Sequence, residues 1–86
     1  MREYPYLSEA IAHVIEEYRK NMGMTKTALA DFSSLERRYL LEIEKGAKKP
    51  TVNAVYSICE ALNVSPVKFF AMVEEERQRL IKYAEE

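Results

Sequence analysis

The sequence is poor in the residues that covalent cross-links, metal sites and catalytic centres require. Its 86 residues include one cysteine, Cys59, one histidine, His13, and no tryptophan. A lone cysteine excludes an internal disulfide, and a lone histidine without cysteine pairs offers neither a set of metal ligands nor a case for catalysis. We therefore expect no metal, no cofactor and no enzymatic activity, and we expect packing alone to stabilise the fold.

Long apolar runs are absent as well. No stretch approaches the roughly 18 consecutive apolar residues of a membrane span, and residues 1–7 lack the apolar segment of a signal peptide. We expect a cytoplasmic protein that does not bind membranes. A chain of this length holds a single domain with one core, which leaves no room for a separate effector-binding domain, so no small-molecule effector is expected.

Glycine is scarce, with two residues in the chain, and no run alternates Val, Ile or Thr with polar residues. Both features argue against hairpins and sheets, and the predicted fold class is all-α. Cap residues, glycines and Pro66 delimit five helices. The predicted helices are Ser8 to Asn21 with Ser8 as cap, Lys26 to Phe32 after Thr25, Glu36 to Lys45 before Gly46, a fourth from the cap Thr51 to Asn63, and a fifth from Ser65-Pro66 to about Tyr83.

The apolar residues of these helices recur at steps of three and four, which is the spacing of a helix face that packs against a core. The second and third helices are short and contribute few such residues. The predicted inner faces consist of Ile11, Val14, Ile15 and Tyr18, then Leu29 and Ala30, then Leu40 and Ile43, and finally Val52, Val55, Ile58, Cys59 and Leu62.

Only residues 33–35 separate the second and third helices, so this pair must turn sharply, as in a helix-turn-helix. The segment from Ile11 to Phe70 resembles the Xre/Cro-type helix-turn-helix family of phage repressors, restriction-modification controllers and antitoxins. The matching pieces, in register, are Tyr18-Arg19 before Gly23-Met24-Thr25, then Leu29-Ala30-Asp31, Tyr39 to Gly46, and Ala61 to Pro66. The resemblance implies a five-helix lambda-repressor-like DNA-binding domain, with residues 7–64 as its core and residues 65–86 as an extended C-terminal helix.

Three positions depart from the family pattern. Lys26 stands where the family usually has Gln, and Glu36 stands where it commonly has a Ser or Thr cap. Ser34 occupies a turn position that usually holds Gly with a positive φ, a conformation that costs other residues about 1 kcal/mol. These departures affect the expected base preference rather than the fold.

The net charge of −1 argues, taken alone, against a nucleic-acid partner. The charge is unevenly divided, however, because residues 19–49 carry a net +4 whereas the other 55 residues carry a net −5. The basic segment, residues 19–49, coincides with the resemblance to a helix-turn-helix and indicates double-stranded DNA as the partner. The alternative is that these charges merely form a solvated surface.

By the resemblance, the third helix lies in the major groove and its early exposed residues contact base edges. Arg37 and Arg38 are the leading candidates, since a guanidinium matches the O6 and N7 atoms of guanine. Glu42 is suited to a cytosine amino group and Leu41 to a thymine methyl, and Glu36 completes the set. Two alternatives are open for each arginine: a phosphate contact, or pairing with Glu36 or Glu42.

Other polar residues of the basic segment are expected to fix the register on DNA by contacting phosphates without reading sequence. For the tyrosine among them, packing within the protein is an equal alternative. The candidates are Lys26, Tyr39, Lys45, Lys48 and Lys49.

Two further residues have an expected role through the resemblance alone. Family members place an arginine late in the first helix against a glutamate late in the third. Arg19 and Glu44 occupy these positions. The resemblance therefore implies a partly buried ion pair between these two helices.

The first half of the C-terminal helix is apolar around much of its circumference, and a domain this small cannot cover all of it. We expect the surplus to pack on a second copy of the chain, giving a homodimer. The alternative is that the helix folds back on its own domain. The expected interface residues are Phe69, Phe70, Met72, Val73 and Leu80.

These observations predict a sequence-specific transcriptional regulator that binds double-stranded DNA as a homodimer on a pseudo-palindromic operator. A protein partner is an additional expectation. The rival interpretation is a protein-interaction module of the same fold, antitoxin-like or partner-binding, with little or no DNA binding. Glu36, Glu42 and the slightly acidic composition motivate this rival.

Overall fold

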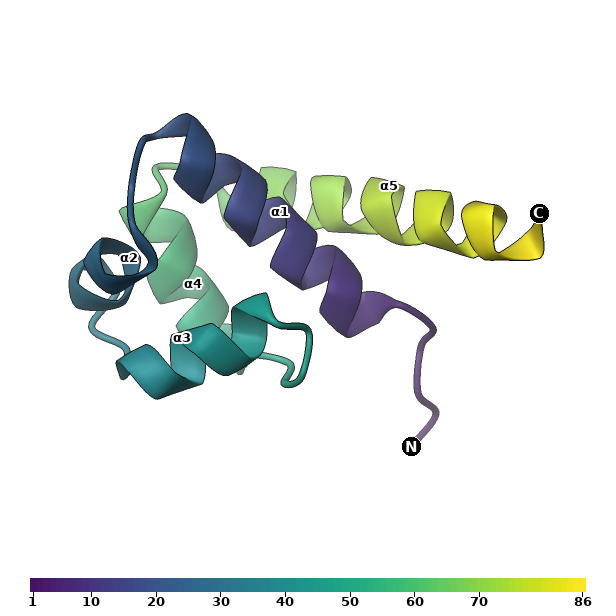
Figure 1. The fold of residues 1–86 in the computed structure, drawn as a ribbon, viewed down its shortest axis with the longest axis horizontal. Helices are drawn as coiled ribbons and strands as arrows, with labels where there is room; N and C mark the ends of the chain where they lie inside the picture. Colours follow the sequence, from purple (N-terminus) through teal and green to yellow (C-terminus); the bar gives the residue numbers. More distant parts are fainter.

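All five predicted helices form in the computed structural model, which describes all 86 residues, and the chain contains no strand. The all-α, five-helix prediction is therefore confirmed (Figure 1). No helix combines the length and the apolar character needed to cross a membrane. The helices are α1 (Leu7–Asn21), α2 (Lys26–Phe32), α3 (Arg37–Glu44), α4 (Val52–Ala61) and α5 (Pro66–Glu85).

Side-chain caps begin three of the helices at the predicted positions. The hydroxyl oxygens of Thr25, Thr51 and Ser65 accept hydrogen bonds of 3.0, 3.1 and 3.1 Å from backbone N–H groups three residues later. Each hydroxyl thus satisfies an N–H group that has no partner within its helix. Pro66 follows directly at the first position of α5, where the missing N–H costs nothing.

The predicted cap of the first helix is wrong. Ser8 lies inside α1, which begins at Leu7, and Tyr6 precedes it in a left-handed conformation with φ 61°. The carbonyl of Tyr6 accepts the first helical hydrogen bond, from the N–H of Ala10 at 2.9 Å. Leu7 packs against the core, and this burial favours one more helical residue than the cap pattern indicates.

The third helix begins at Arg37, one residue later than predicted. Glu36 is extended and occupies the cap position, but its carboxylate accepts no capping hydrogen bond. In the turn before it, Ser34 has the expected positive φ, at 57°.

One core joins all five helices, and it contains 14 buried apolar residues. The predicted inner faces are buried with two exceptions, because Tyr18 is only half-buried and Val52 is 72% exposed. Val52 is the first residue of α4. It shares the helix face of Val55 and Cys59, but it remains exposed at this end of the helix.

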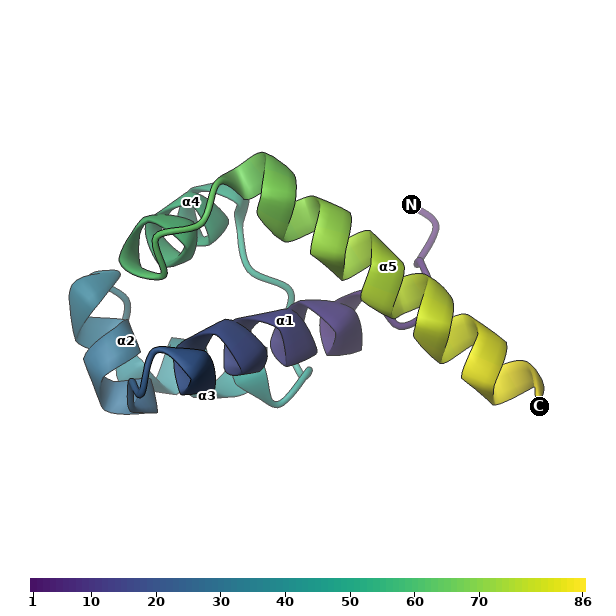
Figure 2. The same ribbon diagram turned by 90° about the horizontal axis from the view of Figure 1, so that it is seen from above.

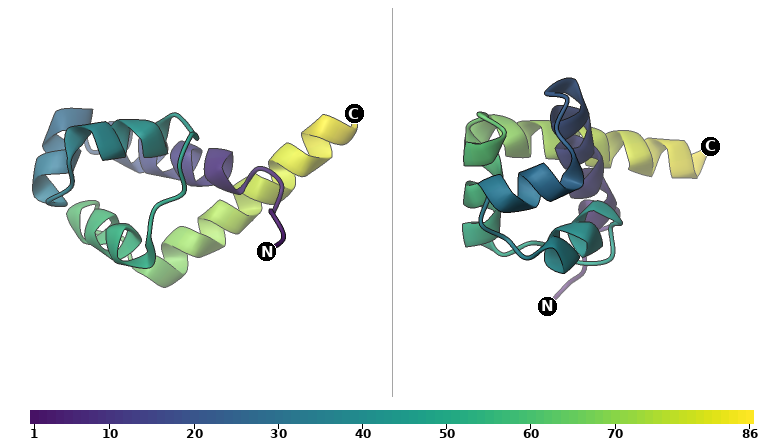
Figure 3. Two further views of the ribbon diagram at one scale, coloured as in Figure 1. Left: turned by 90° about the horizontal axis from the view of Figure 1, so that it is seen from below. Right: turned by 60° about the vertical axis from the view of Figure 1, so that its left-hand side comes forward.

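The helices surround this core in two groups. Figure 2 shows α4 and the beginning of α5 along one side of the molecule, with α1 and α3 along the other and α2 at one end. The second half of α5 extends beyond the other helices (Figures 1 and 3). Phe69 and Val73 of α5 are buried, so the hydrophobic core includes the first half of the C-terminal helix.

Candidate nucleic-acid interface

The turn between α2 and α3 is held by hydrogen bonds to the end of α2. The hydroxyl of Ser33 donates to the carbonyl of Leu29 at 2.6 Å, and the N–H of Leu35 donates to the carbonyl of Ala30 at 2.9 Å. The left-handed Ser34 between them reverses the chain. Leu29 and Ala30 of α2 are fully buried and belong to the same core cluster as Leu40 of α3. The core therefore holds α2 and α3 together on either side of the turn.

Helix α3 buries one face and leaves the other in solvent. Leu40 and Ile43 are buried, whereas four of the base-contact candidates are exposed and Glu42 is half-buried. The exposed four are Glu36, Arg37, Arg38 and Leu41.

The two arginines differ in their surroundings. No hydrogen bond or ion pair engages Arg37, so its guanidinium is free to approach a base edge. Arg38 Nε lies 4.0 Å from Glu42 Oε1 on the next turn, and the Arg38 side chain is 90% exposed. An exposed pair of this length contributes little, so Arg38 is also available to DNA.

The phosphate-contact candidates lie at the start of α2, on α3 and in the loop that follows α3. Lys26, Lys45 and Lys48 are exposed, and the Lys48 ammonium lies 5.7 Å from the centre of the Tyr39 ring. Tyr39 is half-buried, and its hydroxyl oxygen accepts a hydrogen bond of 3.0 Å from the N–H of Thr51. Packing against the start of α4 therefore occupies part of Tyr39, while its hydroxyl proton remains available to a phosphate oxygen.

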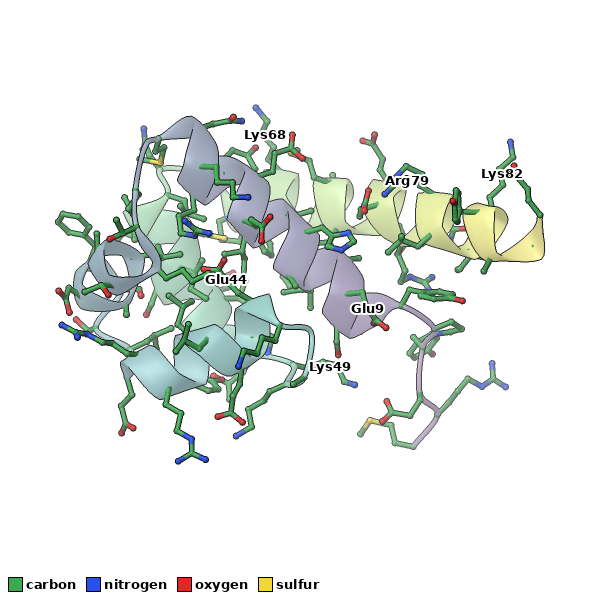
Figure 4. All side chains as sticks on the ribbon, viewed as in Figure 1. Glu9, Glu44, Lys49, Lys68, Arg79 and Lys82 are labelled. Atoms are coloured by element: carbon green, nitrogen blue, oxygen red, sulfur yellow. The ribbon has the colours of Figure 1, made fainter.

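Lys49 has an unexpected partner. Its ammonium lies 3.2 Å from a carboxylate oxygen of Glu3, in the segment that precedes α1. Figure 4 shows Lys49 extending from the loop after α3 toward this segment.

Arg19 and Glu44 lie together beneath α3. Arg19 Nε donates to both carboxylate oxygens of Glu44, at 3.2 and 3.1 Å, and the terminal nitrogen Nη1 donates to the carbonyl of Met24 at 2.9 Å. Both side chains are buried, and Figure 4 shows Glu44 between α1 and α3. The pair ties α3 to α1 and to the loop that leads into α2.

A groove of about 720 Å³ runs beside α3, between the α2–α3 turn and the start of α4. Five uncharged polar side chains that line it were not among the predicted contacts. The hydroxyls of Ser33 and Thr51 already hydrogen-bond to the backbone, which leaves Ser34, Asn53 and Ser57. Hydroxyl and amide groups of this kind donate to phosphate oxygens. The sequence does contain a signal for Asn53. It lies two residues after the predicted cap Thr51, so its side chain could have been placed in the first turn of α4.

Comparison with known proteins gives a match that includes α2, the turn and α3. A family model described as Helix-turn-helix matches residues 15–69, which include α2, the turn, α3 and α4. The chain belongs to the Xre-like helix-turn-helix family of transcriptional regulators. The proteins of this family are DNA-binding regulators rather than enzymes.

A relative of this helix-turn-helix regulator is the uncharacterized HTH-type transcriptional regulator y4dJ of Sinorhizobium fredii. It is 32% identical over 57 residues, which cover 66% of this chain and 74% of the relative.

Two solved structures share the fold. The clp gene regulator ClgR from Corynebacterium glutamicum matches with a TM-score of 0.88 at 25% identity, over 96% of this chain and 88% of that chain. The restriction-modification controller C.Esp1396I, solved as a tetramer with its natural 35 base-pair operator, matches with a TM-score of 0.77 at 34% identity. This match covers 85% of the regulator and 96% of the controller chain.

Two of the expected interface residues are misassigned. Phe69 and Val73 are 1% and 2% exposed within a single chain, so they form part of the core of the helix-turn-helix regulator and are not available to a second copy. Met72 and Leu80 are half-buried against the same core, and Phe70 is 42% exposed. The periodicity of α5 identified an apolar helix, but it did not indicate which face α1 and α4 cover.

Proposed function

We propose that this regulator acts in the cytoplasm as a homodimer that binds a pseudo-palindromic operator. The proposal rests on the exposed face of α3, because this face presents the free guanidinium of Arg37 on a helix whose other face is buried. Arg37, Arg38 and Leu41 would contact base edges, together with Glu36 and Glu42. Lys26, Lys45, Lys48 and Lys49 would contact phosphates, with Tyr39 and Asn53 beside them.

The way in which α3 is held supports contacts to DNA bases in addition to contacts to the DNA backbone. A bidentate arginine–guanine contact requires the helix to hold one orientation in the groove. The buried Arg19–Glu44 pair and the buried Leu40 and Ile43 hold α3 from its inner side.

The homodimer is supported by an apolar surface on α4 and α5. Val52 and Tyr56 on α4 are 72% and 59% exposed, and Val67 and Phe70 on α5 are 84% and 42% exposed. Figure 2 shows α4 and the beginning of α5 on the same side of the molecule, away from α1 and α3. A twofold dimer through this surface would present two copies of α3, as a pseudo-palindromic site requires.

The rival function, a protein-interaction module, draws on Glu36 and Glu42, which stand among the proposed base contacts and would repel phosphates. Salt dependence separates the two functions. DNA binding should weaken steeply as salt rises, because each phosphate contact releases a counterion. Affinity that is negligible at every salt concentration would support the rival.

A matched pair of variants tests the proposed division of roles. Arg37→Ala should reduce the discrimination between a specific and a scrambled duplex by about 1 to 3 kcal/mol. Lys48→Ala should weaken binding to both duplexes about equally and reduce the salt slope by about one. Equal behaviour of the two variants would contradict the assignment of Arg37 to base contact.

A further inference from the structure

Residues 1–6, the N-terminal arm, precede α1 and are not helical. Figure 1 and the right-hand view of Figure 3 show the arm running from the start of α1 to the side of the molecule on which α3 lies. The Glu3 carboxylate of the arm lies 3.2 Å from the ammonium of Lys49, and its side chain is 83% exposed. The arm thus places a carboxylate beside Lys49, the last residue of the basic segment.

The position of this carboxylate matters because of what Lys49 is expected to bind. An ionised carboxylate and a phosphate both present anionic oxygens that accept a hydrogen bond from an ammonium. Glu3 therefore satisfies Lys49 in the way that a DNA phosphate would. The other lysines beside α3, Lys45 and Lys48, have no carboxylate within ion-pair distance.

The arm is held at its other end by α5. The Arg77 guanidinium carbon lies 5.9 Å from the centre of the Tyr4 ring, and Arg77 Nη1 donates to the carbonyl of Pro5 at 3.4 Å. Two hydrogen bonds to Glu74, of 2.9 and 3.1 Å, orient this guanidinium, and only 15% of the Arg77 side chain is exposed. Arg77 thus connects α5 to the segment that carries Glu3.

We propose that Glu3 competes with DNA phosphate for Lys49, and that Arg77 is a positioning residue that keeps Glu3 in place. This inference rests on the proposed phosphate contact of Lys49. DNA binding then exchanges one anionic partner of Lys49 for another and displaces the arm. Because exposed ion pairs contribute little, the competition lowers DNA affinity by about two- to fivefold at low salt.

Glu3→Gln tests the competition, with Glu17→Gln as the matched control. Both substitutions remove one carboxylate, but Glu17 is exposed on α1 and makes no ion pair. Glu3→Gln should tighten binding to a duplex by about two- to fivefold at low salt, and this gain should shrink as salt rises. Unchanged affinity of Glu3→Gln, or an equal gain in Glu17→Gln, would overturn the proposal.

A double-mutant cycle tests whether the effect passes through Lys49. In a Lys49→Gln background, Glu3→Gln should have little effect on affinity, because the competition has been removed. Arg77→Gln should raise affinity in the same direction as Glu3→Gln but less. A full gain in the Lys49→Gln background would show that the effect is general electrostatics and would reject the proposal.

The arm itself provides a readout besides affinity. Backbone NMR order parameters of residues 2–5 should fall when saturating duplex is added, because the arm is displaced. Increased order in these residues would mean that the arm binds DNA, which contradicts the competition. If no variant binds any duplex, the proposed function fails and this inference fails with it, whereas binding by the wild type with Glu3→Gln unchanged rejects this inference alone.

Discussion

Arg19 and Glu44 form a buried ion pair, in which the single N–H of Arg19 Nε is shared between the two carboxylate oxygens at 3.2 and 3.1 Å. The two residues come from α1 and α3, which are separated in sequence by the whole of α2. The pair fixes α3 on the scaffold, and we expect DNA binding to depend on it even though both side chains are buried.

Arg19→Ala should therefore lower the free energy of unfolding by about 3 to 5 kcal/mol, because it leaves the Glu44 carboxylate buried without its partner. Chemical denaturation measures this loss. Lys20→Ala is the control, since Lys20 forms an exposed pair of 3.0 Å with Glu16, worth about 0.3 to 0.5 kcal/mol. An Arg19→Ala protein with unchanged stability would show that the pair does not hold α3.

Adjacent phenylalanines in α5 should respond differently to truncation. Phe69→Ala should cost about 3 to 5 kcal/mol of stability at every protein concentration, because Phe69 is buried in the core of a single chain. Phe70→Ala should cost the single chain less, about 0.5 to 1.5 kcal/mol for the edge-to-face contact of its ring with Phe69 at 5.4 Å, and should weaken the proposed dimer.

Sedimentation and denaturation at several concentrations distinguish the two effects. The wild type should sediment at twice the 10.0 kDa chain mass and unfold with concentration-dependent stability, and Phe70→Ala should reduce both properties. A wild type that remains at 10.0 kDa at micromolar concentration would count against the dimer.

Replacing the left-handed turn residue Ser34 by glycine should stabilise the fold. Its φ of 57° costs a non-glycine residue about 1 to 2 kcal/mol, part of which the greater freedom of glycine in the unfolded chain offsets. Ser34→Gly should therefore raise the free energy of unfolding by about 0.5 to 1 kcal/mol. The helical control Ser57→Gly should lower it, and a loss of stability in both variants would refute the strain at Ser34.

Acid should weaken the contact between α1 and α5. Hydrogen bonds from Arg79, and then from His13 on α1, lower the pKa of Glu76 to about 2. A carboxylate whose pKa is lower in the folded than in the unfolded state stabilises the fold above about pH 4.3, and this contribution is lost as the pH falls toward 2.

Glu76→Gln should flatten the pH dependence of thermal stability in this window, and it should have its largest effect near neutral pH. The neighbouring exposed residue offers the control Glu75→Gln, because Glu75 forms no ion pair. Parallel pH profiles for the wild type and Glu76→Gln would contradict the contribution of Glu76.

The local sequence determined the helices well where a single residue sets the geometry. A hydroxyl at Thr25, Thr51 or Ser65 caps its helix wherever the rest of the chain packs, and these starts were predictable. The start of α1 was not, because the burial of Leu7 and the left-handed Tyr6 depend on tertiary contacts.

In the candidate nucleic-acid interface, too, the features set by local sequence were predictable, and those set by tertiary contacts were not. The positions of Arg37 and Arg38 on the exposed side of α3 follow from the helical period and from the burial of Leu40 and Ile43. The partner of Lys49 does not follow from any such pattern, because Glu3 lies 46 residues away in sequence. The burial of Phe69 likewise depends on how α5 packs against the other helices.

Selection of bound sequences from random duplex DNA with the purified protein is the strictest test of the claim that this regulator reads a pseudo-palindromic operator. One motif should be enriched, with two half-sites related by twofold symmetry and centred about one helical turn, roughly 10 base pairs, apart. Arg37→Ala should reduce the preference at one position of each half-site while leaving the spacing unchanged. Repeated selection that enriches no motif would contradict the claim and support the protein-interaction module.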